Sequence, residues 1–236
     1  GLYVRLKLTE APIFLAALNK PKPKALPMME VIVTHFKPFF LGMLICMAGY
    51  VLFYIMIAFS QIYAKSTPTV SEAGYTMGLG FSPQIFTALL MCSAISLAIT
   101  IAISGKYIDI VGRRIWLIWT TFGVAIFGLA LPYFLDNGTT TSLFWFLMIG
   151  MGLIGMGYGP LASFLPELFP THARYSGASL TYNISGLFGA SVAAIIALPL
   201  NANYGLKGVG IYLTLNAVLS LIGLWFITET KDKHLA

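Results

Sequence analysis

The sequence contains few charged residues, and six long stretches of it contain none. Asp, Glu, Lys and Arg make up 9% of its 236 residues, whereas soluble domains contain about 25%, so a soluble globular protein is excluded. A helix of roughly 20 residues crosses the hydrocarbon core of a bilayer, and a charge at its centre costs about 2.5 kcal/mol or more. The pattern therefore predicts six transmembrane helices, one in each charge-free stretch: 38–64, 73–105, 115–135, 137–166, 175–206 and 208–228.

Cysteine and histidine are also rare. Cys46 and Cys92 fall within predicted spans, where they are expected to act as small apolar residues rather than as a disulfide or metal pair. A membrane enzyme would need a cluster of His, Cys, Asp or Glu at mid-membrane depth or on one membrane face. His35, His172 and His234 lie outside the spans and far apart in the sequence. We therefore expect neither an enzyme nor a bound cofactor.

The net charge of +6 follows membrane topology rather than indicating nucleic-acid binding. If the segment before the first span is cytoplasmic, 12 of the 14 Lys and Arg residues lie on that side, and only Lys65 and Lys207 lie outside. This distribution obeys the positive-inside rule. It predicts a multi-pass protein of the cell (inner or plasma) membrane with both termini in the cytoplasm.

Three regions are expected along the chain. Residues 1–36, with a Pro/Lys run at 20–24, form a cytoplasmic linker; residues 37–228 form an all-α bundle; residues 229–236 form a cytoplasmic tail. The third and sixth spans are the most uniformly apolar and are expected to face lipid. The predicted helices are 37–63, 84–104, 115–135, 142–165, 177–200 and 208–228, joined by outer loops 64–83, 136–141 and 201–207 and by inner turns 105–114 and 166–176.

The inner turn between the second and third predicted spans has the pattern G-x3-D-x2-G-R-R over residues 105–114. A glycine allows close backbone approach or a positive φ at a tight turn. Asp109 could pair with an arginine or lie at the N-terminus of another helix. The turn could thus be a latch that forms when the cytoplasmic side closes, or simply a sharp turn with topology-setting arginines.

The inner turn between the fourth and fifth predicted spans carries two strongly charged residues, Glu167 and Arg174. Glu167 could meet Arg113 or Arg114, and Arg174 could meet Asp109; alternatively each is solvated. An exposed pair contributes only about 0–1 kcal/mol, enough to bias a conformational equilibrium. The candidate cytoplasmic gate therefore comprises Gly105, Asp109, Gly112, Arg113, Arg114, Glu167 and Arg174.

These two turns resemble those of a known superfamily. Residues 105–114, GKYIDIVGRR, resemble the signature loop of the major facilitator superfamily, although Ile110 stands where the fuller pattern has a basic residue. Residues 166–183, PELFPTHARYSGASLTYN, resemble the metabolite:proton symporter family, which includes carriers of α-ketoglutarate, citrate, shikimate and proline or betaine. Residues 5–12, RLKLTEAP, resemble the start of that family's central cytoplasmic loop.

The resemblance implies that the chain is the carboxy-terminal half of a twelve-helix transporter, with its first span as helix seven. Its partners would be an amino-terminal six-helix half, the lipid bilayer, a small-molecule metabolite and protons. The resemblance also implies that the proton-coupling residues lie largely in the absent half. Consistent with that, no acidic residue falls within any of the six stretches.

Without charges in the spans, a substrate surface must consist of hydroxyl, amide and aromatic groups at helical spacing. Small polar residues in membrane helices more often mediate packing, which is the alternative for each candidate. The candidate substrate-binding residues are Tyr50, Tyr54, Gln61, Ser96, Thr100, Tyr158, Tyr182 and Asn183.

The sequence as a whole predicts a secondary active transporter. The function that the resemblance implies is proton-coupled symport of a small polar metabolite, either an organic acid or a zwitterion, by alternating access between two bundles. The alternative is a membrane sensor or structural half-transporter that does not transport.

Overall fold

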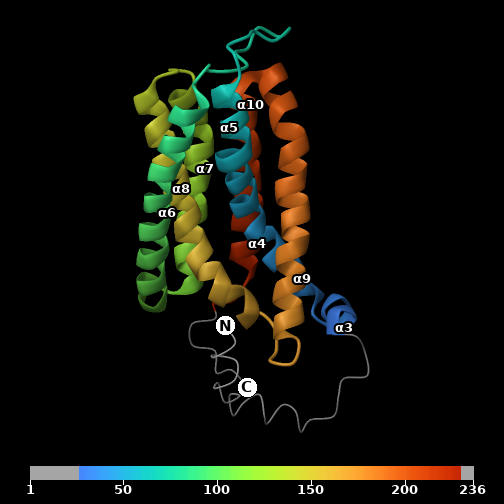
Figure 1. Cartoon of the computed structure of the whole chain (residues 1–236). Helices are drawn as coiled ribbons and strands as arrows, with labels where there is room; N and C mark the ends of the chain where they lie inside the picture. The colour runs from blue at the N-terminus through green and yellow to red at the C-terminus, as the bar shows by residue number, and fades with distance from the viewer. Residues whose placement is uncertain (1–26, 230–236) are drawn as a thin grey trace, which may run out of the picture.

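A computed structural model describes residues 27–229, and Figure 1 shows them as a bundle of upright helices. Apart from one isolated bridge between Val70 and Thr76, the regular secondary structure of residues 27–229 is helical. The helices are α3 (Pro27–Thr34), α4 (Phe36–Tyr54), α5 (Ser60–Lys65), α6 (Pro83–Val111), α7 (Arg113–Leu135), α8 (Thr140–Glu167), α9 (Arg174–Gly186) and α10 (Val192–Phe226). Two π-helical turns, η1 (Ile55–Phe59) and η2 (Leu187–Ser191), continue α4 into α5 and α9 into α10.

Five continuous helices are long and apolar enough to cross a membrane. The fifth runs for 53 residues, from Arg174 to Phe226, and Figure 1 shows it rising through the orange segment and returning through the red one. The reversal occurs at Gly205, whose φ of 65° and ψ of −169° are conformations open almost only to glycine. The backbone therefore crosses the bundle six times, which confirms the predicted six-helix membrane fold.

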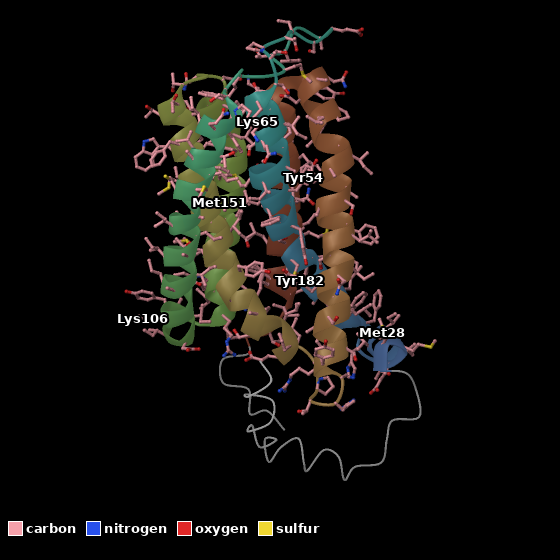
Figure 2. All side chains as sticks on the ribbon, in the orientation of Figure 1. Met28, Tyr54, Lys65, Lys106, Met151 and Tyr182 are labelled. Carbon is pink, nitrogen blue, oxygen red and sulfur yellow. The ribbon has the colours of Figure 1, made fainter. Side chains whose placement is uncertain are left out.

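The bundle has two distinct ends. We call the end where α6 stops and α7 starts the Arg113 end, and the opposite end, which carries the 66–82 connection, the loop end. Figure 2 labels Lys106 near the Arg113 end and Lys65 near the loop end. At the loop end, Ser82 and Thr139 begin helices α6 and α8, because their hydroxyl oxygens accept hydrogen bonds from the N–H groups of Ile85 and Ser142.

Two predicted connections are wrong. The inner turn expected over 105–114 consists of Gly112 alone, because α6 continues through Gly105 to Val111. Gly112 has the predicted positive φ, at 101°, and ends the helix. The expected outer loop 201–207 is also helical, with the single non-helical residue Gly205. Continued helix satisfies the backbone N–H and C=O groups internally, which a membrane requires.

Close glycine contacts set the packing of the bundle. A Cβ added at Gly155 of α8 would lie 2.6 Å from the Leu97 carbonyl oxygen of α6, and one at Gly210 of α10 would lie 2.2 Å from the Gly128 carbonyl oxygen of α7. Glycine thus allows these backbones to touch.

That the third and sixth spans face lipid stays a prediction. The third span, α7, buries 44% of its apolar window within the bundle but exposes Trp119, Leu129 and Tyr133. The last span exposes Leu215, Ile222 and Trp225.

Candidate functional site

Two adjoining cavities lie toward the Arg113 end of the bundle. The first has a volume of about 200 Å³ and is bounded by α4, α7, α8 and one residue of α9. The second has a volume of about 340 Å³ and lies between α8 and α9. Both are lined by Tyr158, Leu161 and Tyr182, so we treat them as one site and call it the tyrosine cavity.

Three tyrosines from three helices meet in the tyrosine cavity. The Tyr182 hydroxyl donates a hydrogen bond of 2.9 Å to the Tyr158 hydroxyl oxygen. The Tyr50 ring lies 5.1 Å from the Tyr182 ring, centroid to centroid, at an interplanar angle of 56°. Figure 2 shows Tyr182 between the ribbons of α8 and α9, on the Arg113 side of Tyr54. The arrangement presents aromatic faces and phenol groups on one wall.

Small residues of α9 and η2 allow Tyr50 to reach this position. A Cβ at Gly186 would meet the Tyr50 ring at 3.2 Å, and one at Gly189 would meet the Tyr50 Cβ at 2.7 Å. Gly189 lies in a π-helical turn, a feature frequent at functional sites. The shape of this wall therefore depends on two glycines as well as on the tyrosines.

Four of the eight candidate substrate-binding residues line the tyrosine cavity: Tyr50, Tyr158, Tyr182 and Asn183. Asn183 lies on the second part, and its amide nitrogen donates a 2.8 Å hydrogen bond to the Ser179 carbonyl oxygen one turn earlier. The amide oxygen of Asn183 is left for another partner, because an amide carries both donors and an acceptor.

The other four candidates lie outside the tyrosine cavity. Ser96 donates a 2.9 Å hydrogen bond to the Met148 carbonyl oxygen of α8, and Thr100 bonds back to the carbonyls of its own helix. Both residues therefore serve the packing of α6 against α8, which was the alternative to substrate binding for each candidate. Tyr54 bonds to the Ala194 carbonyl oxygen at 3.4 Å, and Gln61 is exposed on α5.

Sequence reasoning missed several lining residues. Cys46, Phe53 and Thr121 contribute to the first part of the cavity and Tyr175 to the second. Thr121 belongs to a Thr-Thr pair in the apolar stretch of α7 that follows Arg114. A polar pair in such a stretch is a signal that the sequence offers. No charged residue lines either part of the cavity within residues 27–229.

A mostly buried ion pair lies at the Arg113 end. The Arg113 guanidinium contacts the Glu167 carboxylate across the boundary between α7 and α8, with the two side chains 19% and 14% exposed. This contact is the one expected for Glu167. A second carboxylate, that of Asp109, lies 3.8 Å from Arg113, but its side chain is 72% exposed.

Glu229 and Arg114 join α7 to the end of α10. The carboxylate of Glu229 accepts hydrogen bonds from the backbone N–H groups of Arg113, at 3.2 Å, and Arg114, at 3.0 Å. The Arg114 side chain donates in turn to the carbonyls of Leu224, at 2.8 Å, and Trp225, at 2.9 Å. A carboxylate thus caps the positive end of α7, and a guanidinium caps the negative end of α10. Glu229 had been assigned to a tail and was not predicted as a site residue.

The remaining gate candidates differ in their surroundings. Among the described residues, Arg174 forms no ion pair with Asp109, and its Nε atom is buried without a hydrogen-bond partner. A Cβ at Gly112 would lie 2.9 Å from the Glu229 carboxylate, so Gly112 makes room for this cap. At Gly105 nothing lies within 4 Å of an added Cβ, so no neighbour within the described chain requires a glycine there.

Two of the histidines described as far apart in the sequence are neighbours in space. The His35 and His172 ring centroids are 6.4 Å apart. The His172 Nε2 atom lies 2.7 Å from the Glu30 carboxylate. Glu30 and His35 come from α3 and the residue after it, whereas His172 comes from the connection between α8 and α9. The third histidine, His234, lies outside the described residues.

These features define a multi-pass α-helical membrane protein with a mainly apolar cavity in its bundle, to which several tyrosines contribute. The family model of the Major Facilitator Superfamily matches residues 19–236. The chain belongs to this superfamily, as its turns had indicated.

Several curated relatives match over the full length of the chain. It is 89% identical to a protein of Haemophilus influenzae named "Putative metabolite transport protein", of which it covers 53%. It is 38% identical to the "Inner membrane metabolite transport protein YhjE" of Escherichia coli, of which it covers 52%, and 25% identical to the "Proline/betaine transporter" of Salmonella typhimurium, of which it covers 47%. The chain thus spans about half the length of the curated relatives it matches. No solved structure matches it.

Proposed function

We propose that this bundle is one half of a secondary active transporter for a small polar metabolite. The single observation that carries the proposal is the tyrosine cavity, where Tyr50, Tyr158 and Tyr182 meet inside a membrane bundle. In this superfamily fold, substrates bind near the interface of two bundles that rock against each other. The second bundle would be the amino-terminal half, which the double length of the relatives supports.

Of the two substrate classes, an organic acid or a zwitterion, we favour a zwitterion with a quaternary or secondary ammonium group. Aromatic faces attract such a cation, with about 0.5–1 kcal/mol at exposed sites and about 2 kcal/mol when water is excluded. An organic acid has no cation to place against these faces, and no basic residue lines this cavity within residues 27–229 to pair with its carboxylate. The names of two relatives, which specify proline and betaine, support the same choice.

Uptake into proteoliposomes by the full-length protein tests this proposal. Glycine betaine and proline should be taken up, whereas citrate should not. Tyr182→Phe should leave the KM for betaine within about threefold, because the ring face is kept, and Tyr182→Leu should raise it about tenfold. The matched control is Tyr133→Leu, at an exposed tyrosine near the end of α7. It should leave the KM for betaine unchanged. Equal losses in Tyr182→Phe and Tyr182→Leu would instead support a hydrogen-bonding role.

We further propose that transport is coupled to protons through residues of the amino-terminal half. Among residues 27–229, no acidic residue lines the tyrosine cavity. Uptake measured with and without an inward pH gradient separates proton symport from proton-independent transport. A gradient-dependent rate supports symport; a gradient-independent rate refutes coupling but keeps transport. Binding without any uptake of zwitterion or acid would favour the sensor alternative.

We propose that the Arg113 end faces the cytoplasm of the inner membrane, because the positive-inside rule favours that orientation. Within this end, the gate residues have different roles. Arg113, Arg114 and Glu167 hold their own bundle together, so they do not form a latch between bundles. Asp109, whose side chain is 72% exposed, is the group placed to contact the other half.

Asp109→Asn in the full-length carrier tests this division. Weakening an exposed contact should shift the conformational equilibrium by about 0–1 kcal/mol, seen as increased labelling of cysteines introduced on the cytoplasmic side. Unchanged labelling together with unchanged uptake would remove Asp109 from the gate.

A further inference from the structure

Two imidazoles and a carboxylate converge at the surface of the Arg113 end. One donor atom from each of Glu30, His35 and His172 can be chosen so that all three lie within 4.8 Å of one another. The residues come from two segments of the chain that are far apart: His172 and Glu30 are separated by 142 positions. Neither the tyrosine cavity nor the Arg113–Glu167 pair includes any of them.

A break in the backbone brings the first two residues together. Glu30 and His35 are five positions apart, so on a continuous α-helix they would be rotated by about 140° and would face different directions. His35 instead separates α3 from α4 and has non-helical dihedrals, φ −117° and ψ 35°. The chain changes direction at this residue, and the His35 ring can approach Glu30.

An apolar cluster fixes the two segments relative to each other. Val31 and Phe39, on either side of His35, pack with Phe169 and Ala173, on either side of His172. Val31, Phe169 and Ala173 are almost fully buried. The three polar side chains therefore stand on a packed base, and their meeting does not depend on one exposed contact.

From this arrangement we propose that Glu30, His35 and His172 form a binding site for a divalent transition-metal ion, zinc above all. Two imidazole nitrogens and one carboxylate oxygen are a common zinc donor set that leaves a fourth position for water. Tetrahedral coordination needs donor atoms about 3.4 Å apart. The side chain of His172 is 54% exposed, which leaves it free to make the small movement that coordination requires.

The metal ion would link α3 to the connection between α8 and α9. This connection directly follows Glu167, which pairs with Arg113, and directly precedes Arg174. Bound zinc would therefore restrain the backbone between the two charged residues of this turn, independently of whether the tyrosine cavity binds a zwitterion.

Zinc titration by calorimetry on the full-length protein tests the site. The protein should carry no polyhistidine tag and should contain Cys92→Ser, because Cys92 is an exposed thiol that could bind zinc. The expected result is one equivalent of Zn²⁺ bound beyond the number bound by His172→Ala. His35→Ala and Glu30→Gln should each weaken this binding at least tenfold, because even outer-shell substitutions at metal sites cost about 10–100-fold.

Two variants keep the test decisive if loss variants misfold. Glu30→His supplies a third imidazole and should bind Zn²⁺ at least as tightly as the parent protein. His234→Ala should bind Zn²⁺ with the stoichiometry and affinity of the parent protein. Mg²⁺, which prefers oxygen ligands, should not compete. Equal zinc stoichiometry and affinity in the parent protein and in His172→Ala would overturn the proposal, as would loss of binding in His234→Ala alone.

Discussion

The Arg113–Glu167 pair should contribute more to the stability of the bundle than any other charged contact at this end. The two side chains are only 19% and 14% exposed. Glu167→Gln would leave the guanidinium largely buried, with its Nε atom already lacking a partner. The remaining carboxylate, Asp109, lies 3.8 Å away and is mostly solvated, so it can replace little of the lost interaction.

The magnitude follows from this burial. Removing one member of a buried pair costs about 3–5 kcal/mol, because the other charge stays desolvated. Partial exposure at the bundle end places Glu167→Gln near the lower limit, about 3 kcal/mol. This corresponds to a fall in Tm of roughly 6–12 °C for a bundle of this size that unfolds as its own unit. Asp109→Asn, the matched control on the same arginine, should lower Tm by less than about 2 °C.

Thermal unfolding of the full-length protein in detergent, followed by loss of the monodisperse peak, measures both effects. Arg113→Gln combined with Glu167→Gln should be no less stable than either single variant, because no buried charge is then left unpaired. Additive losses in the double variant, or a fall in Tm of less than 2 °C for Glu167→Gln, would refute the reasoning.

Three further predictions concern stability and use the same unfolding assay. Glu229→Gln removes the charged cap of α7 and should cost about 1 kcal/mol; an unchanged Tm would contradict it. Gly155→Ala places a Cβ 2.1 Å from the Thr100 hydroxyl and should destabilise by about 1–3 kcal/mol, whereas Gly49→Ala, with nothing within 4 Å, should not destabilise. The pKa of Asp136 is raised by burial, an effect that Lys207 partly offsets. The folded protein therefore favours the protonated carboxyl, and the stability that this form contributes is lost as the pH rises through the pKa. Asparagine is neutral at every pH, so Asp136→Asn should raise Tm at pH 8 and leave it unchanged at pH 3. A lower Tm at pH 8 would show that the carboxylate is needed.

The number of spans could be predicted from the sequence because the cost of burying charge acts on each residue locally. The ends of the helices could not. Gly105 and the 201–207 segment looked like breaks, but a backbone in lipid gains more from continued internal hydrogen bonds than a single glycine loses, about 1 kcal/mol. Where the chain does turn, at Gly112 and Gly205, the φ is positive. The motif predicted this for Gly112, whereas Gly205 was expected only as part of the loop 201–207.

The candidate site was predicted in part, for a related reason. Helical spacing identifies the polar face of one helix but not the helix that this face meets. Tyr182 and Asn183 face an open cavity, whereas Ser96 and Thr100 face the glycines of α8 and serve packing. Glu229 lies 115 positions from Arg114, so the cap that joins them appears only after the helices are assembled.

The distribution of charge at the Arg113 end bears on how such a bundle could move. A body that rocks as a unit must keep its own helices together. The contacts that do so here are the mostly buried pair of Arg113 with Glu167 and the hydrogen bonds of Arg114 to the carbonyls at the end of α10. A contact that breaks in every cycle must instead be weak, because each kcal/mol spent on breaking it slows the step several-fold. Asp109 fits that second requirement, since its exposed carboxylate would gain only about 0–1 kcal/mol from a partner. The adjoining ends of α6 and α7 thus carry strong contacts within the bundle and a weak contact available to its counterpart.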